Sequence, residues 1–168
     1  MAIVSSAEAG VKAAARATIL QLRAPGLPTA DLEREARRLV GESSLSVLIS
    51  SRCDVVLACG AAGVNLPERD IRTRDARTLM GGRLVGRSVH SLEGAEAAER
   101  EGADFVIFGP VWESASHTGG GAAGTAALGR VAAAVRIPVL AIGGVTEERI
   151  AECLAAGAAG YAAIGLFA

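Results

Sequence analysis

Lysine is almost absent from this chain of 168 residues, in which Lys12 is the one lysine among 17 basic residues. Lysine chemistry such as a Schiff base is therefore not expected, and charged recognition of a ligand falls to arginine, whose planar guanidinium donates in a fixed geometry. The net charge is −1 and the basic residues are scattered along the chain. Nucleic acids and anionic membranes need a clustered positive surface, so we expect neither as a partner.

Paired cysteines with the spacing of a metal site are also missing. The three cysteines, Cys53, Cys59 and Cys153, are odd in number and stand in apolar or helical stretches, which indicates reduced, buried thiols in a cytoplasmic protein. The first residues contain no basic region followed by a long apolar run, and no apolar stretch approaches membrane-spanning length. We therefore expect neither export nor a membrane anchor.

The chain does contain a regular alternation of strand-like and helix-like segments. With 51% hydrophobic residues in 168, it is long enough for one well-buried core, so we treat residues 1–168 as a single domain. Short aliphatic and β-branched runs are each followed by a segment of helical periodicity, which predicts parallel strands in repeated βα units. The predicted strands are 2–4, 18–22, 46–49, 63–66, 84–88, 105–108, 139–142 and 161–164. Eight such units predict a compact (β/α)8 TIM barrel of the α/β class.

The intervening helices are clearest at 28–39, 92–101, 125–135 and 147–156, where charged residues alternate with Ala, Leu and Val. Thr29, Ser91 and Thr146 stand where N-caps are expected. Gly102 and Gly157 stand where a helix C-terminus commonly needs glycine. These signals support the βα division.

The predicted barrel is unusually short. Eight units leave about 21 residues each, against roughly 31 in a barrel of about 250 residues, so the loops must be minimal. The one long loop is 111–123, which holds the single tryptophan and a glycine triplet, and a loop of that length is usually functional or disordered. The sequence ends directly after the eighth strand, so the eighth helix is missing or reduced to one turn. Either the sequence is truncated or a neighbouring subunit covers that side, and we expect a homodimer.

Two glycines after the seventh strand suit phosphate binding. Active sites of such barrels lie at the C-terminal ends of the strands. Gly143 and Gly144 follow Ile142 and precede a predicted helix, so bare N–H groups can converge on an anion near a helix N-terminus. Gly165, after the eighth strand, lies beside them if the barrel closes. The alternative is that the glycines only make a tight turn.

His90, directly after the fifth strand, is the candidate acid/base, because imidazole moves protons near neutral pH. A lone histidine at a strand end is otherwise a cap or a satisfied polar residue. His117, with Ser116 in the long loop, could close over a phosphate, and a solvated loop histidine is an equal alternative.

Other strand ends supply candidate substrate-binding residues. Gln21 and Arg23 flank Leu22, so period-2 alternation points both toward the barrel mouth, and Ser50 and Ser88 end their own strands. Arg23 could hold a carboxylate through two hydrogen bonds, or could instead pair with Asp31 or Glu33. Asp70 is a lone carboxylate among arginines, which makes a poor metal site.

Four motifs in this order resemble the thiamine-phosphate synthase/TenI superfamily of barrels over nearly the whole chain. They are Ile-Leu-Gln-Leu-Arg (19–23), Val-Gly-Arg-Ser-Val-His-Ser (85–91), Gly-Ala-Asp-Phe-Val-Ile-Phe-Gly-Pro-Val-Trp (102–112) and Pro-Val-Leu-Ala-Ile-Gly-Gly-Val-Thr (138–146). The resemblance implies one of two activities. The synthase joins a pyrimidine pyrophosphate to a thiazole phosphate with Mg²⁺ held by two aspartates and lysines on the pyrophosphate. TenI is a tautomerase that converts a carboxythiazole phosphate into its aromatic tautomer.

The sequence departs from the synthase pattern where the synthase carries charge. Ala24-Pro25 replaces an acidic residue and lysine, Ser50-Ser51 replaces Asn-Asp before Arg52, and His117 replaces the loop lysine. Asn65 stands where the synthases carry a histidine, and Asp70 is retained from the two aspartates that hold Mg²⁺ in the synthases. Mg²⁺ is therefore expected only under the synthase alternative, and no cofactor otherwise.

The tautomerase is therefore the expected member, closest to TenI. The resemblance implies that His90 is the general acid/base and that the ligand is a small phosphorylated thiazole. Gly143, Gly144, Gly165 and the long loop with Ser116 and His117 would hold its phosphate, while Gln21 and Arg23 would orient its carboxylate. A third possibility is a non-catalytic module that only binds a thiazole or thiamine phosphate.

Overall fold

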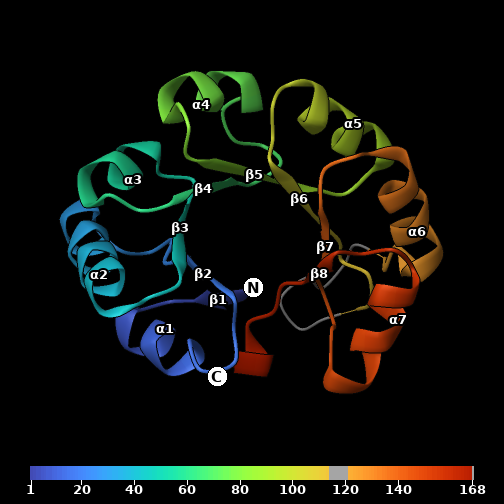
Figure 1. The fold of residues 1–168 in the computed structure, drawn as a ribbon, viewed down its shortest axis with the longest axis horizontal. Coiled ribbons are helices and arrows are strands. Elements are labelled where there is room, and N and C mark those ends of the chain that lie inside the picture. The colour runs from blue at the N-terminus through green and yellow to red at the C-terminus, as the bar shows by residue number, and fades with distance from the viewer. Residues whose placement is uncertain (114–120, 168) are drawn as a thin grey trace.

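The predicted TIM-barrel fold is confirmed by the computed structural model, which describes residues 1–113 and 121–167. Eight parallel strands form one sheet in the order β1 to β8. Figure 1 looks down this barrel, with the strands as an inner ring and helices α1 to α7 around it. The strands are β1 (Ala2–Val4), β2 (Ile19–Leu22), β3 (Ser46–Ser50), β4 (Gly63–Leu66), β5 (Leu84–Val89), β6 (Phe105–Phe108), β7 (Val139–Ala141) and β8 (Gly160–Tyr161). The predicted strand bounds agree closely except at β8.

Three helices that the periodicity did not single out lie in the first half of the chain. They are α1 (Ala7–Ala13), α3 (Cys53–Cys59) and α4 (Thr73–Met80), all of eight residues or fewer, too short for a strong periodic signal. The helices that were predicted are α2 (Thr29–Glu42), α5 (Leu92–Arg100), α6 (Gly124–Ala134) and α7 (Ile150–Ala155). The predicted segment 147–156 begins as a 3₁₀ turn, η1 (Glu147–Arg149), before α7.

Two of the three predicted N-caps differ from expectation. Ser91 caps α5 as predicted, because its hydroxyl accepts the N–H of Gly94 at 3.0 Å. Thr29 is instead the first residue of α2, after Pro28, which has no side chain able to cap. Thr146 does stand at the N-cap of η1, but its side chain accepts no capping hydrogen bond. Gly102 and Gly157 take positive φ values of 92° and 93° after α5 and α7, as the C-terminal glycine pattern predicted.

The barrel closes through a short contact between β8 and β1. Ala2 and Ala163 form a parallel bridge, the N–H of Ile3 donates to the oxygen of Ala163 at 2.9 Å, and the N–H of Ala163 donates to Met1 at 3.2 Å. Residues 162–164 were predicted as part of the eighth strand, but only Gly160–Tyr161 form it, because beyond Ala163 the chain turns away.

A single 3₁₀ turn, η2 (Gly165–Phe167), stands where an eighth helix would pack, as expected from the sequence. Figure 1 shows this red segment between α7 and α1. Phe167 is 8% exposed, and its ring stacks on that of Tyr161 at a centroid distance of 6.1 Å. Ile164, just before η2, is 51% exposed, but the homodimer that would cover this side stays a prediction.

Alternation along each strand divides the core into an inner and an outer layer. Ala2 and Val4 face the helices, whereas Met1, Ile3 and Leu48 pack with Phe105 inside the barrel. Toward the C-terminal strand ends, this inner layer changes from apolar to polar side chains. Among the described residues, no helix is both long and apolar enough to cross a membrane.

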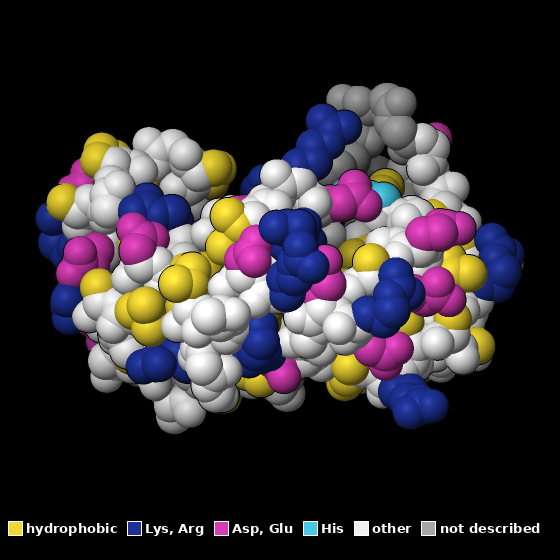
Figure 2. Space-filling model, turned by 90° about the horizontal axis from the view of Figure 1, so that it is seen from above, with side chains coloured by type: hydrophobic (Ala, Val, Ile, Leu, Met, Phe, Trp, Pro, Cys, Tyr) yellow, Lys and Arg dark blue, Asp and Glu magenta, His cyan; other side chains and the backbone are white. Residues whose placement is uncertain are grey.

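The outer surface carries both signs of charge. Figure 2 shows Lys/Arg and Asp/Glu side chains interleaved over the visible helical face, without a continuous field of basic residues. Several of these charges pair within one helix, such as Lys12 with Glu8 and Arg37 with Glu33, both at 2.7 Å. Exposed pairs of this kind contribute little to stability.

Candidate functional site

A cavity of about 270 Å³ opens at the C-terminal ends of the strands. It brings together six of the residues that the sequence singled out, from the ends of four different strands. These are Gln21, Arg23, Ser50, Ser88, His90 and Gly143. Asn65, Glu68, Pro110 and Ile164 also line the cavity but were not among the predicted site residues. Asn65 near the end of β4 and Glu68 just after it stand at a strand end in the sequence as well, but neither was assigned to the site.

Two polar side chains that line the cavity are almost fully buried. Gln21 is 2% exposed and Asn65 is 3% exposed. The amide nitrogen of Asn65 donates to the Ser88 hydroxyl at 3.1 Å, which links the ends of β4 and β5. The side-chain oxygens of Gln21 and Asn65 accept no hydrogen bond from the described residues. An unsatisfied buried acceptor costs about 1–3 kcal/mol, so these oxygens favour a ligand that donates hydrogen bonds to them.

His90 is held from two directions at the end of β5. Its Nδ1 atom hydrogen-bonds to the carbonyl oxygen of Gly109, which fixes Nδ1 as the donor because a carbonyl only accepts. Its main-chain N–H donates to Glu68 Oε1 at 3.3 Å. The second ring nitrogen, Nε2, is 4.0 Å from Glu68 Oε2. Nε2 is therefore the nitrogen that can exchange a proton with a bound molecule.

The guanidinium of Arg23 remains available at the rim of the cavity. The expected alternative partners are engaged elsewhere: Asp31 pairs with Arg34, and Glu33 pairs with Arg37 at 2.7 Å. No ion pair of Arg23 is found among the described residues. Its main-chain N–H donates to Val4 at 2.8 Å, which anchors the strand end while the side chain lines the cavity. The arrangement suits recognition of a carboxylate.

The glycine pair after β7 has conformations and neighbours that exclude a side chain. Gly143 and Gly144 have φ values of 91° and 64°. A Cβ atom on Gly143 would lie 2.5 Å from Pro110 Cβ, and one on Gly144 would lie 2.7 Å from Trp112 Cβ. Both glycines are therefore required by close packing as well as by the turn.

The carbonyl groups of this pair accept hydrogen bonds, whereas its N–H groups donate none within residues 1–113 and 121–167. Gly143 O accepts the N–H of Trp112 at 3.0 Å, and Gly144 O accepts Arg149 Nη1 at 2.7 Å. The Arg149 guanidinium also lies over the Trp112 ring, 5.0 Å from its centroid. No hydrogen bond from the N–H of either glycine to the described part of the chain is found. The two donors are therefore available to an anion.

Gly165 lies beside the glycine pair, as expected from closure of the barrel. Gly143, Gly144, Thr146 and Gly165 all line a second cavity of about 370 Å³. Gly143, Ile142 and Ile164 line both cavities, so the two are adjacent lobes of one site. Ser116 and His117, the other predicted phosphate-binding residues, lie outside the described residues.

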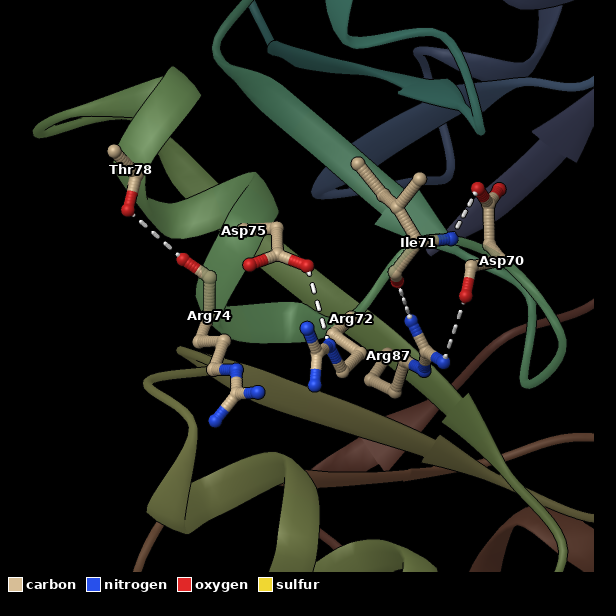
Figure 3. A network of polar contacts seen from close by, with 7 residues as sticks. All are labelled: Asp70, Ile71, Arg72, Arg74, Asp75, Thr78 and Arg87. Carbon is tan, nitrogen blue, oxygen red and sulfur yellow. Dashed lines mark hydrogen bonds and ion pairs between the residues drawn. The ribbon is translucent and has the colours of Figure 1, made fainter.

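The residues described do not fit a magnesium site of the synthase type. Asp70 Oδ1 accepts the N–H of Ile71 at 2.7 Å, and Asp70 lines neither cavity. Arg87 Nη2 lies near the main-chain oxygen of Asp70, at 3.5 Å (Figure 3). Within residues 1–113 and 121–167, no group of three or more His, Cys, Asp or Glu side chains is gathered as a metal site would require.

Comparisons with known proteins agree with the family suggested by the four motifs. A family model described as thiamine monophosphate synthase matches residues 2–167. A protein of Geobacter sulfurreducens named "Putative thiamine-phosphate synthase" is 44% identical over 150 residues, covering 86% of this chain and 70% of its own. A thiamine-phosphate synthase of Methanoculleus marisnigri is 38% identical over 161 residues, covering 93% of this chain and 76% of its own.

Solved structures give the same result. Thiamine phosphate pyrophosphorylase from Pyrococcus furiosus superposes with a TM-score of 0.86 at 31% identity, covering 94% of this chain and 78% of that one. The structure of FabK from Thermotoga maritima superposes with a TM-score of 0.81 at 21% identity, covering 99% of this chain and 56% of that one, which supports the fold alone. The relatives are named for the synthase, and none of those described here is named for TenI.

Proposed function

The chain belongs to the thiamine-phosphate synthase/TenI family of thiamine biosynthesis enzymes, and from that premise we propose that it is a TenI-like thiazole tautomerase. The proposed reaction is an isomerisation that moves one proton on a carboxythiazole phosphate and makes its ring aromatic. The observation that carries the proposal is His90, which lines a cavity together with Arg23 and Gly143 and has Nδ1 engaged by Gly109, so that Nε2 is left for a ligand.

The proposed ligand occupies both lobes of the site. Its phosphate accepts hydrogen bonds from the N–H groups of Gly143, Gly144 and Gly165, near the start of η1. Arg23 donates to its carboxylate, and Gln21 contacts the ring from the floor. These contacts fix the ring relative to His90, and positioning of this kind supplies much of the rate enhancement in such reactions.

His90 then transfers the proton. Its Nε2 delivers a proton to the exocyclic carbon of the alkene and takes up the proton that the ring carbon loses, so His90 returns to its starting state and atoms and charge are conserved. Gly109 holds Nδ1 throughout, so the imidazole keeps its orientation while Nε2 changes its protonation state. Because the product gains aromaticity, one acid/base group and correct positioning are sufficient.

Thiamine-phosphate synthesis is the second candidate, and the names of the relatives favour it. That reaction needs charge neutralisation of a pyrophosphate. Lys12 is the one lysine of the chain and lies in α1, paired with Glu8, and the described residues do not fit the magnesium site. The residue pattern therefore supports the tautomerase better than the transferase.

One set of assays separates the candidates. The purified protein is given the carboxythiazole tautomer without metal, and separately pyrimidine pyrophosphate plus thiazole phosphate with Mg²⁺. We expect conversion in the first assay and no thiamine phosphate in the second. Formation of thiamine phosphate would establish the transferase instead.

Two variants test the role of His90. His90→Asn and His90→Ala should each lose tautomer conversion by about 100-fold or more, which is typical for loss of a general acid/base. Full activity in both variants would eliminate the proposed role. Calorimetry with thiazole phosphate covers the third possibility, because binding without any turnover would indicate a non-catalytic module.

A further inference from the structure

Glu68 is the one acidic side chain that approaches His90 in the described structure. It lies in the segment between β4 and α4, 22 residues before the histidine. Its Oε1 accepts the main-chain N–H of His90 at 3.3 Å, and its Oε2 is 4.0 Å from Nε2. The carboxylate therefore contacts both the backbone and the reactive edge of the same residue.

The main chain that carries Glu68 is fixed by an arginine from the neighbouring strand. Arg87, in β5, donates from Nη2 to the carbonyl oxygen of Glu68 at 2.6 Å and from Nη1 to that of Ile71 at 2.6 Å. Figure 3 shows the guanidinium directed at the carbonyl groups of this segment. Both ends of residues 68–71 are thus hydrogen-bonded to β5, the strand that ends directly before His90. The position of the Glu68 main chain relative to His90 therefore depends on β5.

Other charged groups near His90 have different orientations or partners. Arg23 lines the same cavity, and Asp70 accepts the N–H of Ile71. On α5, the Ser91 hydroxyl caps the helix, and Glu93 lies in its exposed first turn. A Cβ atom on Gly94 would lie 3.7 Å from Glu68 Oε1, so the carboxylate is next to the positive end of α5.

The two sides of the imidazole therefore face two acceptors. Nδ1 meets the carbonyl oxygen of Gly109, and Nε2 meets a carboxylate. The 4.0 Å separation from the carboxylate is longer than a hydrogen bond, so Nε2 remains free to contact a bound molecule while a negative charge lies beside it.

We propose that Glu68 is the positioning partner of His90: it accepts the main-chain N–H of the histidine and places a negative charge 4.0 Å from Nε2, the atom that exchanges the proton. The contacts do not depend on the proposed function, but their effect on catalysis does. Arg87 contributes indirectly, because it holds the main chain of Glu68. Gly109, Glu68 and Arg87 together would set the orientation and the surroundings of one catalytic side chain.

Glu68→Gln separates charge from structure. The glutamine keeps an oxygen that can accept the His90 N–H, but it removes the negative charge. We expect kcat to fall by about tenfold or more while KM changes by less than about twofold, since the ligand contacts remain. Glu96→Gln is the matched control, because Glu96 lies on α5 and pairs with exposed Arg100 at 3.9 Å. It should leave both constants unchanged.

A second measurement requires no turnover. Diethylpyrocarbonate acylates the unprotonated Nε2 of histidine, and peptide mass spectrometry follows His90 separately from His117. In Glu68→Gln at neutral pH, we expect His90 to be modified about threefold to tenfold faster, because the negative charge 4.0 Å from Nε2 is removed. Formate added to Glu68→Ala should partly restore the slower rate.

The two measurements test the inference about Glu68 and the proposed function separately. Equal modification rates in the wild-type protein and Glu68→Gln would overturn the inference about Glu68. A faster rate in Glu68→Gln, with no tautomer conversion by the wild-type protein, would overturn the proposed function and leave the Glu68–His90 pair standing.

Discussion

Gly144 lies directly against Trp112, so that a Cβ atom at position 144 would stand 2.7 Å from the tryptophan Cβ and 2.7 Å from the carbonyl oxygen of Glu113. The start of the loop after β6 is thereby packed onto the turn after β7. This contact joins the glycine pair to the tryptophan and to Arg149, which lies over its ring. The proposed phosphate site is therefore defined by packing between two loops.

Gly144→Ala should lower the free energy of unfolding by about 1–3 kcal/mol, because alanine is strained at a φ of 64° and its methyl group meets main-chain atoms. Urea unfolding measures this change. The same variant should bind thiazole phosphate more weakly in calorimetry, because the N–H groups are displaced.

Gly41→Ala is the control for that substitution. Gly41 lies near the end of α2 with no atom within 4 Å of an added Cβ, so alanine should raise the free energy of unfolding by about 0.5–1 kcal/mol. If both glycine variants changed stability in the same direction, the packing argument for Gly144 would be wrong.

Trp112 should report directly on ligand binding. It is the single tryptophan of the chain, and its main-chain N–H donates to Gly143 at 3.0 Å. An anion on the N–H groups of Gly143 and Gly144 would attract Arg149 and alter its contact with the ring. Titration with thiazole phosphate should therefore change the tryptophan fluorescence in a saturable way. Binding in calorimetry with unchanged fluorescence would place the phosphate elsewhere.

Arg23→Gln should weaken binding of a carboxylated thiazole by about tenfold or more, the usual effect of losing a hydrogen bond to a charged group. It should have little effect on a thiazole phosphate that lacks the carboxylate. Steady-state kinetics and calorimetry with the two ligands measure the difference. Arg34→Gln, which removes an exposed partner of Asp31, serves as the control. Equal losses for both ligands would contradict a specific carboxylate contact.

The three thiols should react slowly in the folded protein. Burial raises the pKa of Cys53, and the nearby carboxylates of Asp70 and Asp54 raise it further. Burial also raises the pKa of Cys59 and the pKa of Cys153. We expect Ellman's reagent at pH 8 to label the native chain far more slowly than the chain in urea, because the thiolate is the nucleophile.

The same pKa shifts predict the direction of a pH effect on stability. A thiol whose pKa is raised by folding keeps its proton at pH values at which the same thiol in the unfolded chain has lost it. Its contribution to the free energy of unfolding is therefore complete below the unfolded pKa and is lost as the pH rises through the folded pKa. The free energy of unfolding should therefore decrease in mildly alkaline solution. Substitution of all three cysteines by alanine should remove that part of the decrease.

The order of the elements and the kinds of residue at each strand end follow from the amino-acid sequence alone. Alternating apolar runs and helical segments predicted eight parallel strands in the order that the structure has. His90, Gln21 and Gly143 were identified because residues that follow parallel strands share one end of a barrel. Such local patterns need no knowledge of which strands are neighbours.

Which of these side chains meet depends on how the strands pack against one another. The hydrogen bond from Asn65 to Ser88 depends on the register of β4 against β5, and the approach of Gly165 to Gly143 depends on closure of the barrel. Glu68 reaches His90 because Arg87 fixes an irregular segment that carries no periodic signal. Contacts between separate strand ends follow from register and main-chain geometry, which residue types alone do not encode.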